Sequence, residues 1–293
     1  MSLKETLDAV NKDIYSTLDK KNQKTVLHNI GTRTPIMPAY IICDINNSES
    51  TAGARKVIQS IKDTDSKLMP VIVPATTPET LKHDLAIFGM ERKNWTYPRK
   101  GEKRIDLVTG LHLTGYGAND IEKVVSCMVS HMKCWLFSLA THFPAIVLEH
   151  DALFVNKFDI FKDHGIQEGQ KDMDLNSYGI VGLNNPKGAT RKASIYHSKV
   201  VEESEKTLMP TLSGHKVVDA PWVDDNKDAP QGLAGNSAYF ITDVMATRLL
   251  QKIRDYGLWP NDALMCKQLF PNQIKQIYPF MTELQGIKST TQG

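Results

Sequence analysis

The sequence predicts an α/β fold, with a mostly parallel sheet flanked by helices, built as a single domain with long loops. Apolar segments typical of strands alternate with amphipathic segments typical of helices, as in a parallel sheet wrapped by helices. Of the 293 residues, 41% are hydrophobic and 23% are charged, which is enough for a substantial core. No repeat, low-complexity tract or clean linker divides the chain, so we expect residues 1–293 to form one domain.

The first elements follow from the spacing of apolar residues. An amphipathic helix is expected within residues 1–24, where Ser2 and Glu5 resemble a capping box. Strands are predicted at 38–45 and 68–75, and helices at 51–62 and 77–90. Their alternating order is the main support for a parallel sheet.

The middle of the chain contains the strongest helix signal. An apolar stripe runs from Ile121 to Leu139, and Asn119 and Glu122 are placed to cap its start. Further strands are predicted at 145–151, 178–185 and 236–242, further helices at 243–257 and 261–270, and a frayed tail at 285–293.

Charge and cysteine content limit the class of protein. The formal net charge of +2 is too small to indicate a nucleic-acid partner, so any basic surface must be local. The four cysteines lack metal-ligand spacing and are predicted to be buried free thiols in a reducing compartment. The N-terminus has no apolar signal core and no window approaches 18 apolar residues, so we expect no membrane span and a cytoplasmic location.

Glu149 and Asp151 lie at the end of a predicted strand, in the segment AIVLEHDALFV. Alternate residues of an extended chain point to the same side, and ligands of an open parallel sheet bind at the carboxyl ends of its strands. The pair therefore suits a divalent cation such as Mn²⁺ or Mg²⁺, which prefers oxygen ligands. In an alternative interpretation, Glu149 caps a turn and Asp151 caps a short helix. His150 points to the opposite side and is expected to pack or to form hydrogen bonds.

The segment 125–155 resembles the central signature of glycosyltransferase family 25. In that family, a helix with a Ser-His pair and a Trp leads into a strand that ends in an acidic Leu-Glu-Asp-Asp-Ala motif. The matching residues are Ser130, His131, Trp135, Leu148, Glu149, Asp151 and Ala152. His150 replaces the middle acid, which leaves two carboxylates where the family usually has three.

Weaker likeness to the same family extends to residues 40–61, 235–253 and 257–265. The resemblance implies a GT-A fold, a Rossmann-like sheet that binds a nucleotide-diphospho-sugar and a divalent metal. It also implies transfer of the sugar, with a UDP-sugar as the first choice of donor, to an acceptor hydroxyl.

The resemblance assigns roles to the acidic residues. Glu149 and Asp151 would hold Mn²⁺ or Mg²⁺ at the donor diphosphate. The transfer would be inverting, with Asp262 of the Pro-x-Asp segment as the base that activates the acceptor hydroxyl. The alternative for Asp262 is to cap the helix that follows it. Asp225, in an acidic cluster with Asp224 and Asp228, is a second candidate for base or metal binding, the alternative being a solvated loop.

Five further residues suit the donor or acceptor by their positions. Asp44 and Asn46 end the first strand and suit ribose or base contacts, and His131 suits a sugar or phosphate contact. Asn236 and Ser237, in the loop before a strand, suit hydrogen bonds to donor or acceptor. The alternatives are a satisfied core position for His131 and ordinary turn chemistry for the Asn-Ser pair.

The loop 91–104 concentrates positive charge and aromatic rings. It contains Arg92, Lys93, Trp95, Tyr97, Arg99, Lys100, Lys103 and Arg104. Basic side chains interleaved with aromatics suit a phosphate backbone with stacked bases. The acceptor is therefore predicted to be either a glycan or a hydroxymethylated base in the double-stranded DNA of a bacteriophage, which would place the protein in the host cytoplasm. A solvated loop, or cations that bind the donor diphosphate, are the alternatives.

Two other classes of function remain open at this point. A nucleotidyltransferase on a similar sheet would use the same carboxylates, but it usually carries a Gly-rich basic loop, of which CDINNSESTAGAR is a poor version. A binding module that has lost catalysis is suggested by His150 in the acidic motif.

Overall fold

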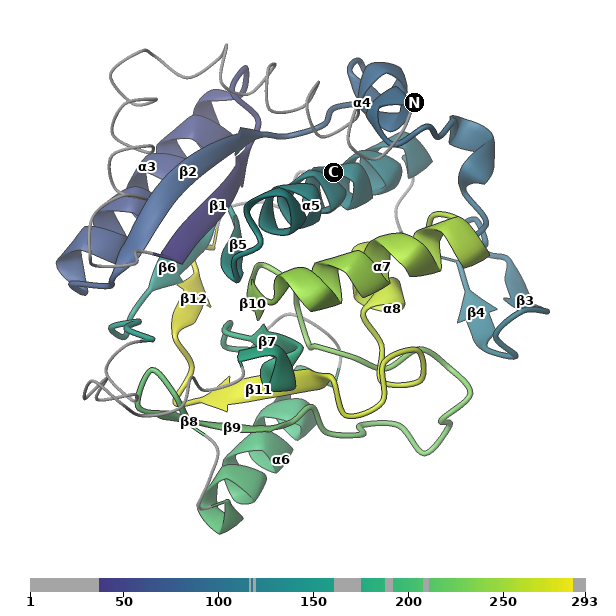
Figure 1. Ribbon diagram of the computed structural model, residues 1–293. Coiled ribbons are helices and arrows are strands. Elements are labelled where there is room, and N and C mark those ends of the chain that lie inside the picture. The colour runs from purple at the N-terminus through teal and green to yellow at the C-terminus, as the bar shows by residue number, and fades with distance from the viewer. Residues whose placement is uncertain are drawn as a thin grey trace.

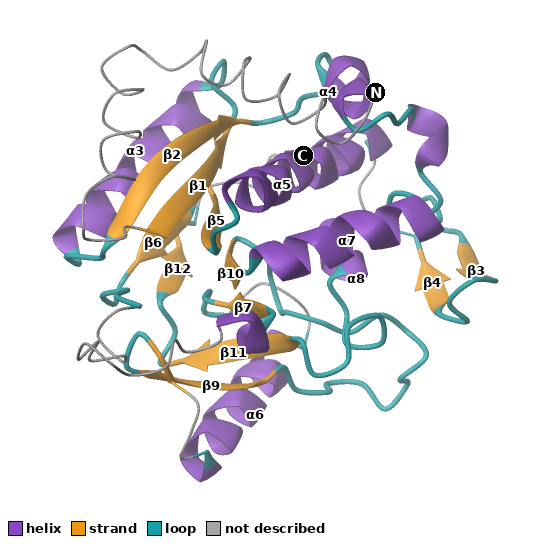
Figure 2. Cartoon of the chain, viewed as in Figure 1, coloured by secondary structure: helices purple, strands orange, loops and turns teal. Residues whose placement is uncertain are grey.

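The computed structural model describes residues 37–115, 117, 120–160, 175–187, 192–207 and 211–286. The helix predicted within 1–24, the predicted cap residue Asn119 and the tail after residue 286 lie outside this part of the chain. The α/β prediction is confirmed, because an eight-stranded sheet is flanked by helices on both faces (Figure 1, Figure 2).

The strand order in the main sheet is β2–β1–β5–β10–β7–β11–β9–β8. Its strands are β1 (Met37–Cys43), β2 (Leu68–Pro74), β5 (Ala145–Glu149), β7 (Ile180–Gly182), β8 (Thr211–Leu212), β9 (His215–Asp219), β10 (Ala238–Ile241) and β11 (Ile274–Tyr278). β1 pairs in parallel with β2 and β5, and β11 with β7. β10 runs antiparallel to both of its neighbours, and β9 is antiparallel to β11 and β8, so the sheet is mixed.

Two small sheets complete the fold. β6 (Ala152–Phe154) pairs with β12 (Thr282–Leu284) just beyond the end of β5. β3 (Lys103–Ile105) and β4 (His112–Thr114) form a hairpin in the predicted basic loop. The single strand predicted at 145–151 is therefore two strands, separated by a turn at His150 and Asp151.

The helices are α3 (Ser48–Asp63), α4 (Leu81–Ile87), α5 (Ile121–Thr141), α6 (Ala193–Lys206), α7 (Asp243–Tyr256) and α8 (Asn261–Leu264), with short 3-10 helices η1 (Arg92–Asn94) and η2 (Leu175–Tyr178). α4 and α8 are shorter than predicted, and α6 was not predicted. α5 starts at Asp120, whose carboxylate accepts the backbone N–H groups of Glu122 and Lys123.

The sheet separates two apolar cores, and alternate residues of one strand enter different cores. Tyr40 and Ile42 of β1 belong to the core that includes α5 and α7, whereas Ala39 and Ile41 belong to the core that includes α3. α5 and α7 lie side by side on one face, and α3 covers the other (Figure 2). A central strand buried on both faces explains the unbroken apolar run that predicted β1.

Among the described helices, α5 alone has the length and apolar composition of a membrane span. Of its most apolar window, 72% is buried inside the fold, as in the core helix of a water-soluble domain. The sequence prediction missed this window because it required a continuous apolar run. The position of α5 is important for function, because its buried face lies against the end of β5.

Candidate functional site

The carboxyl end of β5 brings together residues that are far apart in the sequence. β10 begins beside this end, with Ala238 opposite Leu148, and the Glu149 N–H donates to the Ser237 carbonyl at 2.7 Å. Asn236 and Ser237 are both buried beside Glu149 as a result. Sequence order alone did not show this proximity, since it depends on the reversed direction of β10.

His131 of α5 contacts Glu149 from the neighbouring helix. Its Nε2 lies 3.4 Å from Glu149 Oε1, and its Nδ1 lies 2.9 Å from the Tyr239 hydroxyl oxygen. The Trp135 indole N–H donates to the same hydroxyl at 2.8 Å. His131 is fully buried, so Tyr239 and Trp135 fix its ring in place from the core side. His131 is therefore a buried core residue whose Nε2 has only the Glu149 contact among the described residues, and its role toward sugar or phosphate stays a prediction.

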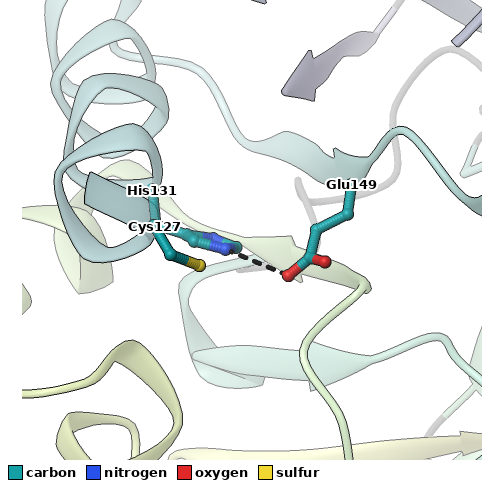
Figure 3. A group of neighbouring side chains, drawn as sticks. All are labelled: Cys127, His131 and Glu149. Carbon is teal, nitrogen blue, oxygen red and sulfur yellow. Dashed lines mark ion pairs between the residues drawn. The ribbon is translucent and has the colours of Figure 1, made fainter. Parts of the chain in front are cut away.

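Cys127 lies one helical turn before His131 and completes a group of three side chains. Figure 3 shows Cys127 and His131 projecting from α5 toward Glu149. One ligand atom from each of the three lies within 4.8 Å of the others. The sequence interpretation treated Cys127 only as a buried thiol. Its spacing of four residues from His131, which puts both on one helix face, was the signal that could have identified it.

Electrostatics separate the two carboxylates that the sequence paired. Burial raises the pKa of Glu149, but the contact with His131 outweighs burial and holds that pKa below its usual value. Burial, and then the charge of Glu149, raise the pKa of Asp151 to about 7. The two groups interact strongly and titrate as a pair, in which Asp151 keeps its proton to a higher pH than Glu149 does. A cation between them would allow both to ionise.

His150 lies in the turn between the two carboxylates and is half-buried. Burial lowers its pKa, against the opposing charges of Glu149 and Asp44. Its backbone carbonyl accepts from the Gln285 side chain, and the Asp151 carbonyl accepts from the Gln285 N–H. These bonds tie the turn to the segment after β12.

Several buried side-chain atoms around this end of the sheet have no hydrogen-bond partner. In the part of the chain that the structure describes, they include His131 Nε2, Asp151 Oδ1, Asn184 Oδ1, Asn236 Oδ1 and Nδ2, Ser237 Oγ, Thr282 Oγ1 and Gln285 Oε1. Leaving a buried polar group unpaired costs about 1–3 kcal/mol. Their concentration here indicates a site that a polar ligand or water completes.

Asp262 is the second residue of α8, whose N-cap is Pro260, and no side-chain hydrogen bond caps this helix. The Asp262 carboxylate accepts the N–H of the next residue, Ala263, at 2.8 Å, so the capping contact of the alternative interpretation is not observed. Burial, and then the charges of Glu149 and Asp262, raise the pKa of Cys127, so Asp262 lies within electrostatic reach of the same thiol. Asp225 is exposed, and its neighbour Asp224 is ion-paired with Lys192 at 2.5 Å. Within the described residues, no hydrogen bond or ion pair joins Asp225 to Glu149.

Asp44 and Asn46 lie after β1, which is the parallel neighbour of β5. Ile42 pairs with Glu149 in register, so Asp44 follows at the same edge of the sheet. Its carboxylate accepts the Asn46 N–H at 3.1 Å. Asn46 is exposed. The end of β1 therefore lies beside the end of β5, and the role of Asp44 and Asn46 in ribose or base contacts stays a prediction.

Of the two aromatic residues in the loop 91–104, Tyr97 is buried and Trp95 is half-buried, so the nucleic-acid role of this loop stays a prediction. Tyr97 is buried, with its ring 5.5 Å from that of Trp259, and Trp95 packs on Tyr97. Arg92 is ion-paired with Glu122 at 2.6 Å, and Lys93 is ion-paired with Glu91 at 2.9 Å. The exposed basic residues of the loop are Lys93, Arg99, Lys100, Lys103 and Arg104.

Two concave regions lie away from the carboxylates. One, of about 510 Å³, lies between the segments 88–96 and 253–257, and includes Lys93. The other, of about 270 Å³, lies between α7 and the segment 269–273. Neither is lined by a residue of the group around Glu149. The functional site is therefore placed at the end of β5, where buried polar atoms lack partners. Such atoms are completed by a polar ligand or water, whereas a concave surface alone does not imply a ligand.

Comparisons with known proteins identify the family of the chain. A family model described as glycosyltransferase family 25 (LPS biosynthesis protein) matches residues 106–265, more than half of the chain and every residue of the site except those after β1 and after β11. No curated protein matches the sequence significantly. The crystal structure of mouse xyloside xylosyltransferase 1, apo form, is similar over 80% of this chain and 82% of its own, with 10% identity and a TM-score of 0.33, a likeness too weak to support an argument.

Proposed function

Because the chain belongs to glycosyltransferase family 25 and is a glycosyltransferase, we propose that it transfers a sugar from a nucleotide-diphospho-sugar to a glycan hydroxyl at the carboxyl end of β5. The observation that carries this location is the concentration of buried, unpaired polar atoms around Glu149. A UDP-sugar is the donor that we propose to test first.

Donor binding is assigned to the two strand ends beside β5. Asn236 offers an amide and Ser237 a hydroxyl, and neither group has a partner among the described residues. They can therefore bind sugar or phosphate oxygens without breaking an existing bond. Asp44 and Asn46, at the end of β1, are placed to contact the nucleoside. This arrangement follows the general position of ligands in open α/β sheets.

The residues present fit a divalent cation at this site. Glu149 is ionised, and Asp151 Oδ1 is buried without a partner in the described part of the chain, so two carboxylate oxygens are available. A bound Mn²⁺ or Mg²⁺ would neutralise the donor diphosphate and stabilise the departing nucleoside diphosphate. The chain itself holds the two carboxylates at one strand end. His131 contacts Glu149, and Tyr239 fixes the position of His131.

Asp262 is our candidate for the base that accepts the proton of the acceptor hydroxyl, in an inverting transfer. Its half-buried carboxylate is oriented by its own helix start and lies within electrostatic reach of Cys127, as Glu149 does. Asp225 is a second candidate that would require its exposed loop to close over the site. We favour a glycan acceptor over DNA because Tyr97 is buried against Trp259, and Trp95 is half-buried against Tyr97 with Arg92 over its ring, which leaves little aromatic surface for stacked bases.

A donor-hydrolysis and transfer screen tests the proposal. Purified protein with Mn²⁺ would be incubated with UDP-, GDP- and CMP-sugars, and nucleotide release would be measured with and without glycan acceptors. Release from one donor that is lost in Glu149→Gln, and kept in Glu203→Gln on the exposed face of α6, supports the site. Folded protein that releases no nucleotide from any donor would overturn the proposal and favour a binding module without catalysis.

A further inference from the structure

Cys127, His131 and Glu149 form a group that the proposed sugar transfer does not explain. Carboxylates alone suffice to bind Mn²⁺ or Mg²⁺, and a thiol is a poor ligand for either ion. We propose that these three side chains form a site for a borderline-soft divalent cation of the zinc class. The site shares Glu149 with the proposed function but rests on its own geometry.

The spacing of the ligand atoms fits such an ion. One atom from each side chain lies within 4.8 Å of the others, and His131 Nε2 and Glu149 Oε1 are 3.4 Å apart. Tetrahedral Zn²⁺ with bonds of about 2.0–2.3 Å separates its ligand atoms by roughly 3.3–3.8 Å. The 3.4 Å between His131 Nε2 and Glu149 Oε1 already lies in this range. Cys127 and His131, four residues apart on α5, present their ligands on one helix face, as helical metal-binding pairs do.

The surroundings of His131 are those of a metal-bound imidazole. A ligating histidine commonly donates its other ring N–H to a fixed acceptor, which sets the tautomer. Here Nδ1 lies 2.9 Å from the Tyr239 hydroxyl, whose oxygen has two lone pairs and also accepts from Trp135. With the proton on Nδ1, the Nε2 lone pair faces Cys127 and Glu149. Nε2 is buried, lies 3.4 Å from Glu149 Oε1, and has no other polar partner among the described residues.

Charge and ligand number also favour a cation. The carboxylates of Glu149 and Asp262 both act on the Cys127 thiol, so the space between the three ligands is electronegative. Three protein ligands leave the fourth position of a tetrahedral ion open for water or a substrate oxygen, which is the arrangement of catalytic rather than structural zinc sites. A thiolate ligand selects this class of ion over Mg²⁺.

Cobalt spectroscopy tests the site without measuring transfer activity. The full chain, treated with a chelator and then titrated with Co²⁺, is expected to show thiolate-to-cobalt charge-transfer absorption and the visible bands of tetrahedral cobalt. Zn²⁺ should remove these bands, and Mg²⁺ should not. Cys127→Ser should abolish the charge-transfer band, whereas Cys134→Ala, in the same helix but in the core, should keep it.

Tyr239→Phe tests the role of the outer hydrogen bond. We expect Zn²⁺ affinity to fall about 10- to 100-fold while the band is retained, as for other outer-shell partners. If Cys127→Ser does not fold, the wild-type protein can still be probed by alkylation: Zn²⁺ should protect the Cys127 peptide and leave the pattern of the other cysteines unchanged.

A wild-type protein that binds Co²⁺ with no thiolate band, or a band that survives in Cys127→Ser, overturns the inference. So does alkylation of Cys127 at the same rate with and without Zn²⁺. These failures would leave the proposed sugar transfer untouched, because Mn²⁺-dependent nucleotide release measures a different property. Conversely, a cobalt band in a protein that releases no nucleotide would support the metal site alone.

Discussion

Helix α5 contributes to two buried carboxylate clusters with opposite properties. On one side, Asp84 accepts from Thr76 Oγ1 at 2.5 Å and from Lys133 Nζ at 3.0 Å, and the Thr76 N–H donates to Ser130 Oγ at 2.8 Å. On the other side lies His131, which follows Ser130 in the sequence. Its Nε2 faces Glu149 and accepts or donates no hydrogen bond among the described residues. In the first cluster, which we call the closed cluster, protein groups satisfy the carboxylate. In the second, the open cluster, they leave polar atoms without partners.

The pKa shifts follow the same division. Burial raises the pKa of Asp84, but the Lys133 charge and the hydrogen bonds outweigh burial, so its pKa is lowered. Among the described residues, Asp151 has no such cation, and burial with the Glu149 charge raises its pKa to about 7. Burial alone therefore does not identify a functional carboxylate. The informative property is whether protein groups provide the hydrogen bonds and opposite charges that a buried carboxylate needs. They do so for Asp84, whereas in the cluster at β5 a ligand would have to provide them.

The largest effect on stability is expected at the closed cluster. Asp84→Ala leaves the buried Lys133 ammonium without its partner, and we expect the free energy of unfolding to fall by about 3–5 kcal/mol. Urea denaturation followed by circular dichroism measures this loss. Glu202→Ala in α6, which removes an exposed partner of Lys206, is the matched control and should change little. A similar small change in both variants would contradict the distinction between the clusters.

At the open cluster, the expected loss is in activity. Glu149→Gln removes the ionised carboxylate that we assign to cation binding, and transfer is expected to fall by at least about 100-fold, equivalent to about 2.7 kcal/mol. The variant should remain folded, because Gln keeps the shape and its amide can still bond to His131. Steady-state rates at saturating donor, together with thermal melting, separate the two effects. A fully active Glu149→Gln variant would contradict the assignment of Glu149 to cation binding.

A smaller, pH-dependent effect is expected at Asp151. Its folded pKa of about 7 exceeds the unfolded value near 3.8, so the folded state holds a proton that the unfolded state releases between these values. Stability contributed by this group is therefore lost as pH rises toward 7. In chelator, Asp151→Asn should stabilise the protein relative to wild type by about 1–2 kcal/mol at pH 8, after allowance for solvent screening, and hardly at all at pH 4. Urea unfolding at both pH values measures the difference, and a pH-independent difference would contradict the shift.

The smallest effect is expected in the exposed basic loop. Arg99→Gln combined with Arg104→Gln should leave transfer to a glycan acceptor unchanged, because neither side chain is joined to the β5 site in the described structure. Duplex DNA should neither stimulate nor inhibit nucleotide release. Inhibition by DNA that disappears in the double variant would show that this loop binds nucleic acid after all.

The sequence placed the candidate site at the strand ends, but it did not show which residues lie together there. The strands beside Asp44, Glu149 and Asn236 were predicted, because an apolar run with polar residues at one end is a local pattern, although β1 and β5 end two residues earlier than predicted. The direction of β10 was not, since it depends on pairing with β5 and β7. That antiparallel pairing is what brings Ser237 beside Glu149.

The errors have a similar origin in distant contacts. Tyr97 was interpreted as a stacking surface because its partner, Trp259, lies more than 150 residues further along the chain. Cys127 was missed because, within an apolar helical stripe, a thiol that faces the core and one that faces a site have the same spacing. Only the approach of Glu149 from β5 distinguishes them.

The hydrogen bond between Trp135 and Tyr239 also has an optical consequence. The indole N–H is bound to a hydroxyl that contacts His131, so a ligand that moves or polarises His131 also changes the environment of a fully buried indole. Indole emission responds to such changes in its hydrogen bond. The fold therefore contains its own fluorescent reporter, through which occupancy of the site can be followed in real time without a label.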